Sequence, residues 1–122
     1  MLFPRISLPA LLFLGAGLAA EASTVGNVFY FTPDVGACGY NNTGSDPVGT
    51  VSSTTFKSFP NPICKHNLTI TAGNVTISVF IRDYFPEDKN AKKNDVGIPE
   101  FEFVKFAPLD DGIVENASWG IV

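Results

Sequence analysis

The sequence predicts an all-β domain, a barrel of many short strands with one or two helical turns. Three observations lead to this prediction. Residues 68–81 alternate Leu, Ile and Val with Thr and Ser around a Gly73-Asn74 turn, which is the pattern of a β-hairpin. Loops rich in glycine, proline, asparagine and aspartate separate the other short apolar segments. Long helical segments do not alternate with the strands, so a βαβ sheet is disfavoured.

The remaining elements follow from local signals along the chain. Gly, Asn, Ser and Asp dominate the loop at 36–47, Ser52 or Ser53 is expected to cap a helical turn, and Pro99 suits the first turn of a helix. In chain order we expect a strand at 27–31, a loop at 36–47, a strand at 48–52, a helical turn at 53–56, hairpin strands at 68–71 and 75–81, a charged loop at 83–97, a short helix at 99–106 and a last strand at 113–122.

The first 22 residues are interpreted as a secretory signal peptide. Arg5 precedes a short apolar segment, and Ala20-Glu21-Ala22 offers cleavage after Ala20 or after Ala22. The apolar segment is too short to cross ~30 Å of hydrocarbon, which disfavours a membrane anchor. Residues 23–122 then form a single secreted domain of roughly 100 residues.

The chain has two cysteines, Cys38 and Cys64, and secretion places both in an oxidising environment. We therefore expect one disulfide between them. Closing this loop is expected to stabilise the fold by about 3.5 kcal/mol. A free thiol pair and a metal site are the alternatives, and two cysteines with a single histidine make a poor zinc site. We expect no metal and no cofactor.

Four N-x-S/T sequons indicate a glycoprotein of a eukaryotic secretory route: Asn41, Asn67, Asn74 and Asn116. The net charge is -4, and Lys89, Lys92 and Lys93 are diluted by neighbouring acids. A nucleic-acid partner is therefore disfavoured. We also expect a monomer with no membrane contact after signal cleavage.

Many small motifs resemble the RlpA-like double-psi β-barrel family, which includes small secreted fungal proteins, barwin-like proteins and the first domain of expansins. The first half carries the Gly36-Ala37-Cys38-Gly39-Tyr40 segment, and Asn61-Pro62 with Cys64-Lys65 follows it. The second half carries Ile81-Arg82-Asp83, the Ala107–Asp110 segment, Gly112 and Trp119. The resemblance covers the mature chain. It implies a six-stranded double-psi β-barrel with a shallow groove that binds polysaccharide or a partner.

Two departures from the family pattern bear on function. Phe85 and Asp88 stand where many members have a second cysteine pair, although Asp83-Tyr84-Phe85-Pro86-Glu87 is close to the expansin version. Gly97 replaces the aspartate that the resemblance ties most closely to function; Asp95 approaches that position only with a two-residue slip. Glycoside hydrolysis usually needs two facing carboxyl groups. We therefore expect a protein that is not an enzyme.

The candidate groove residues are Tyr40, Asp83, Tyr84, Phe85 and Asp95. Exposed aromatic rings can stack on sugars. Each ring can equally pack under its own loop, and this alternative is strong for Phe85. A lone carboxylate such as Asp83 more often caps a loop. His66 is expected to be an exposed loop residue without a catalytic role, and Trp119 to be in the core.

The sequence favours a secreted, non-catalytic protein of the cell wall or extracellular matrix that binds polysaccharide in the groove. One alternative is a protein-binding module, such as a protease inhibitor or a secreted effector, with residues 85–97 as the contact segment. A second alternative is residual expansin-like wall loosening that uses Asp83.

Overall fold

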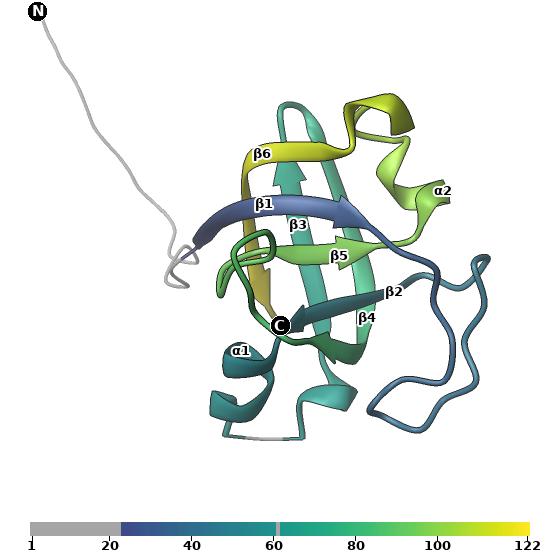
Figure 1. Ribbon diagram of the computed structural model, residues 1–122, viewed down its shortest axis with the longest axis vertical. Coiled ribbons are helices and arrows are strands. Elements are labelled where there is room, and N and C mark those ends of the chain that lie inside the picture. Colours follow the sequence, from purple (N-terminus) through teal and green to yellow (C-terminus); the bar gives the residue numbers. More distant parts are fainter. Residues whose placement is uncertain (1–22, 61) are drawn as a thin grey trace, which may run out of the picture.

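The computed structural model describes residues 23–60 and 62–122, so the predicted signal peptide lies outside the described residues. Six strands form a closed barrel in the order β1-β5-β2-β4-β3-β6 (Figure 1). The strands are β1 (Thr24–Tyr30), β2 (Val48–Ser52), β3 (Asn67–Ala72), β4 (Val75–Phe85), β5 (Val96–Ile98) and β6 (Ile113–Ile121). Two short helices, α1 (Ser53–Ser58) and α2 (Glu100–Phe103), and the 3-10 turns η3 (Ile63–Lys65) and η4 (Leu109–Asp111) complete it. The predicted six-stranded all-β barrel is confirmed.

The β3–β4 hairpin forms as its alternation predicts. Leu68 pairs with Val79 and Ile70 with Ile77, and all four side chains are buried. Gly73 opens the two-residue turn at a φ of +59°, a left-handed conformation that glycine adopts without a side-chain penalty. The apolar face of this hairpin therefore supplies one wall of the core.

Strand β2 begins and ends where the sequence predicts, and every residue in it is buried. It lies between β4, with which it pairs in parallel, and β5, with which it pairs antiparallel. Ser52 then caps α1, because its hydroxyl accepts a hydrogen bond of 3.1 Å from the Thr55 amide. The barrel wall thus leads directly into the helix.

The prediction of a charged loop at 83–97 is wrong at both ends. Strand β4 continues to Phe85, and Val96 and Gly97 already belong to β5. Strand β5 is short and buried because it lies between β1 and β2, so it shows no alternation. The helix expected at 99–106 is also shorter: α2 spans Glu100–Phe103, with Pro99 at its N-cap.

The disulfide between Cys38 and Cys64 is confirmed, with Cα atoms 5.8 Å apart. It joins the β1–β2 loop to η3. Trp119 is a core residue with 5% of its surface exposed, and its indole N–H donates to the Asn94 carbonyl at 2.8 Å. Among the helices of residues 23–60 and 62–122, none has the length and apolar character to cross a membrane.

Candidate functional site

The outer wall of the barrel carries a row of aligned residues across four strands. Phe29 of β1 pairs with Gly97 of β5, Gly97 pairs with Thr50 of β2, and Thr50 pairs with Asp83 of β4. The resemblance places a functional aspartate at the position of Gly97. A Cβ atom at Gly97 would lie 2.6 Å from Phe29 Cε2 and 2.7 Å from Thr50 Cγ2. The Phe29 ring therefore occupies the space that a side chain at position 97 would need.

Phe29 also contacts Phe85 from β4. The ring centroids are 5.2 Å apart in an edge-on arrangement, and both side chains are half-buried. Phe85 thus packs on the wall against β1 instead of projecting freely. Phe29 carries no sequence signal of its own, because only the register of β1 against β5 brings it over Gly97.

Asp83 holds the β1–β2 loop against the barrel. Its Oδ1 accepts hydrogen bonds from the Ala37 amide at 3.0 Å and the Tyr84 amide at 2.8 Å. A Cβ atom at Gly36 would lie 2.8 Å from the Asp83 carboxyl carbon, so the loop backbone approaches this group closely. The geometry is that of a loop cap.

Asp95 does not face an open groove. Only 7% of its surface is exposed. Its Oδ1 accepts from the Asn27 amide at 3.0 Å and its Oδ2 from the Lys92 amide at 2.9 Å. Both oxygens are thereby engaged with backbone donors, so the prediction of Asp95 as a groove residue does not fit its burial. The Asp83 and Asp95 carboxylates are thus both bonded to backbone amides.

Two tyrosines among the predicted binding residues are exposed. Tyr84 is 39% exposed and leans against Phe56 of α1, with ring centroids 4.9 Å apart. Tyr40 is 50% exposed and lies under the Arg82 guanidinium at 4.1 Å. The same guanidinium lies 4.9 Å from the Phe80 ring, and it donates to the Cys64 carbonyl. No local pattern predicted this stacked cluster beside the disulfide, because its rings come from the β1–β2 loop and from β4.

The 86–95 loop, which joins β4 to β5, is fixed by its own carboxylates and by its neighbours. Asp88 accepts from the Asn90 and Ala91 amides, each at 2.8 Å, and Glu87 accepts from the Thr54 amide of α1 at 2.9 Å. Trp119 and Asp95 hold the far end of the loop through the bonds described above. Figure 1 shows the loop beside α1, on the other side of the barrel from the β1–β2 loop.

These hydrogen bonds change the titration of two exposed carboxyl groups. Hydrogen bonds from Thr54 hold the pKa of Glu87 below its ordinary value of 4.5. Backbone hydrogen bonds from Asn90 and Ala91 hold the pKa of Asp88 below its ordinary value of 3.8. Both groups therefore favour the charged form that orders the loop.

The loop exposes lysine side chains beside its acids. Lys89, Lys92 and Lys93 are all exposed. The ion pair found within residues 23–60 and 62–122 is Lys105–Glu102, which lies elsewhere. Glu87 and Asp88 are exposed as well and favour the charged form, so the loop presents both signs of charge to a partner.

The other predicted residues lie apart from this loop. Asn41, Asn74 and Asn116 are exposed, whereas Asn67 is half-buried with its amide 3.4 Å from the Ser78 hydroxyl. His66 is half-buried against Phe59 instead of freely exposed, and its Nδ1 lies 3.1 Å from the Val122 carbonyl. No group of three metal-ligating side chains occurs in the described part of the chain.

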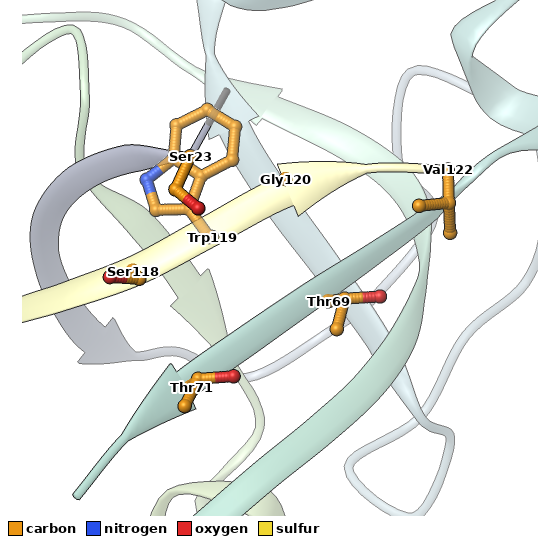
Figure 2. A pocket seen from close by; sticks show the side chains of 7 residues that line it. All are labelled: Ser23, Thr69, Thr71, Ser118, Trp119, Gly120 and Val122. Atoms are coloured by element: carbon orange, nitrogen blue, oxygen red, sulfur yellow. The ribbon is translucent and has the colours of Figure 1, made fainter. Parts of the chain in front are cut away.

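A shallow hollow of about 200 Å³ lies over β3 and β6 (Figure 2). Hydroxyl groups surround it, and Ser23 lies beside the indole ring of Trp119. Its lining residues are Ser23, Thr69, Thr71, Ser118, Trp119, Gly120 and Val122. None of the predicted binding residues reaches this hollow.

The closed six-stranded barrel has the double-psi β-barrel fold that the sequence resemblance implied, and solved structures share this fold. The chain is similar in structure to the Streptomyces papain inhibitor, with 26% identity and a TM-score of 0.70 over 83% of this chain and 94% of that one. It is also similar to a mutant Clavibacter michiganensis expansin in complex with cellohexaose, with 16% identity and a TM-score of 0.63 over 83% of this chain and 50% of that one. No protein-family model and no curated protein sequence matches the chain.

Proposed function

We propose that this chain is a secreted, non-catalytic inhibitor of papain-like proteases, and that the 86–95 loop is its contact segment. The observation that carries the proposal is an exposed loop, held by its own hydrogen bonds, on a barrel whose match covers 94% of a papain inhibitor's chain. Secretion and the glycosylation of exposed sequons belong to the same proposal.

A rigid loop suits an inhibitor for a thermodynamic reason. Ordering a flexible loop on binding costs free energy, and a loop already held in one conformation avoids much of that cost. Here Glu87, Asp88 and Asp95 supply that order from within the folded chain. The contact surface then needs little rearrangement when it meets a protease.

The outer wall supports a binding role over catalysis. Phe29 fills the space beside Gly97, and Asp83 and Asp95 both accept hydrogen bonds from the backbone. A hydrolytic pair would need one carboxyl group poised as an acid and a second as base or nucleophile.

Papain inhibition by the full mature chain tests the proposal. Replacing residues 89–93 with alternating glycine and serine leaves the anchors in place and is expected to raise the inhibition constant at least about tenfold, or ~1.4 kcal/mol. The same replacement at residues 42–46, in the β1–β2 loop, is the matched control and is expected to leave the constant unchanged. Inhibition that survives the 89–93 replacement, or no inhibition of papain, contradicts the proposal.

Polysaccharide binding is the second candidate, and the exposed Tyr84 beside Phe56 is the observation that favours it. An aromatic face of this kind can stack on a sugar ring. Retention on chitin, cellulose and β-glucan, compared between the wild type and Tyr84→Ala, tests this candidate. It fails if neither protein is retained, or if both are retained equally.

A further inference from the structure

Another surface lies between the turn after α2 and the start of β6. It is a hollow of about 570 Å³, which we call the acidic groove. This volume falls within the range of ligand-binding clefts, roughly 300–1,000 Å³. Its lining residues are Phe106, Ala107, Asp111, Ile113, Val114 and Glu115.

The floor of the acidic groove is apolar. Phe106, Ala107 and Val114 pack against the core from below, and Ile113 remains 45% exposed. Val104, in the turn that leads to Phe106, is 53% exposed. Exposed aliphatic side chains gathered around a hollow and bordered by polar groups are typical of an interaction surface.

Acidic residues are concentrated in the segment that forms the groove, and two of them, Asp111 and Glu115, line it. Residues 99–115 contain five carboxylates and one lysine, so this segment alone carries the net charge of -4 that the chain has. Lys105 pairs with the buried Glu102 at 2.9 Å. The other four acids are exposed, and within the described residues they form no ion pair: Glu100, Asp110, Asp111 and Glu115.

We propose that the acidic groove binds a protein segment that combines aliphatic side chains with lysine or arginine. The aliphatic side chains would cover Ile113 and its neighbours, and the basic groups would face the rim carboxylates. Anionic membrane surfaces are disfavoured because the rim would repel them. The chain segments that line the groove, the turn after α2 and the start of β6, lie away from the 86–95 loop in Figure 1, and no residue of that loop lines the groove.

A nuclear magnetic resonance titration of the isotope-labelled, unglycosylated mature chain tests this proposal. The probe is a short synthetic peptide of leucine and lysine, compared with the same peptide carrying glutamate for lysine. The lysine peptide is expected to shift backbone amide signals within 104–116, and its dissociation constant to rise about fivefold between ~50 and ~200 mM salt because screening weakens the contact. The glutamate peptide is expected to shift none of them.

Surface variants separate the charged and the apolar contributions. Asp111→Asn with Glu115→Gln is expected to weaken lysine-peptide binding at least about fivefold, whereas Asp34→Asn in the β1–β2 loop leaves it unchanged. Ile113→Ser is expected to weaken binding similarly, and Val25→Ser, at a side chain that is 55% exposed elsewhere, is its control.

Three outcomes overturn the proposal. The first is equal binding of the glutamate peptide, and the second is a set of shifts centred outside 104–116. The third is binding of a chitosan oligomer at these amides that Ile113→Ser leaves intact, because a cationic sugar without aliphatic side chains would then be the better occupant. Papain inhibition does not enter this test, so its failure and that of the inhibitor proposal are distinguishable.

Discussion

Substituting alanine for Gly97 tests whether Phe29 occupies the space beside it. The added Cβ would lie 2.6 and 2.8 Å from Phe29 ring atoms and 2.7 Å from the Thr50 methyl group. The ring must then swing away and lose its contact with Phe85. Overpacking costs roughly 1–3 kcal/mol, and a lost aromatic pair about 0.5–1.5 kcal/mol.

Gly97→Ala is therefore expected to lower the free energy of unfolding by about 2 kcal/mol. In a domain of this size the melting temperature falls by roughly 8–16 °C. Urea and thermal unfolding followed by circular dichroism measure both quantities. Gly120→Ala in β6 is the matched control, because no atom lies within 4 Å of its Cβ position. It is expected to be neutral or to stabilise the protein by up to about 1 kcal/mol.

A double-mutant cycle shows whether the Phe29 ring causes the loss of stability in Gly97→Ala. In a Phe29→Ala background the space beside position 97 is open, so most of the cost of Gly97→Ala should disappear. If the cost persists in that background, or if Gly97→Ala is no worse than Gly120→Ala, then Phe29 does not occupy the space as described.

Three other expectations follow from the contacts around the loops. Replacing Cys38 and Cys64 with serine should lower the free energy of unfolding by about 3.5 kcal/mol, measured by urea unfolding against the oxidised protein; an unchanged midpoint would contradict it. The depressed pKa of Glu87 means that its contribution is present above its ordinary value of 4.5 and is lost as the pH falls through the folded value. The protection factor of the Thr54 amide, its exchange rate relative to the intrinsic rate at the same pH, should therefore fall in acid, and Glu87→Gln should remove most of that change in protection. Asp83→Ala should destabilise the fold by about 1–3 kcal/mol through the loss of its hydrogen bonds to the Ala37 and Tyr84 amides, measured by urea unfolding. In a wall-extension assay, the wild type and Asp83→Asn should both show only background activity.

The local sequence pattern was sufficient to predict much of this fold. The hairpin was predictable because Leu68, Ile70, Ile77 and Val79 alternate with polar residues and meet each other across one turn. Strand β2 was predictable because its apolar residues lie between a polar loop and a serine cap. The presence of two cysteines was sufficient to predict the disulfide between Cys38 and Cys64.

The region after Asp83 could not be predicted from local signals. A bulge shifts the β2–β4 register there and ends the alternation. Strand β5 has three residues, too few for a period to show. From the sequence, Asp95 was interpreted as an acid of an open loop, because its hydrogen-bond partner Asn27 lies 68 residues away and no local pattern connects the two. The candidate site could not be predicted because its contacts join strands that are far apart in the sequence and meet only when the barrel closes.

The hydrogen bond from Trp119 to Asn94 gives the protein a built-in optical reporter. Trp119 is the single tryptophan of the chain, and its indole is bound to the end of the 86–95 loop. Tryptophan emission depends on the polarity around the ring and on the hydrogen bond its N–H makes. Occupation or distortion of the loop should therefore register in the intrinsic fluorescence of the unlabelled protein, while occupation of the distant acidic groove should leave the emission spectrum unchanged.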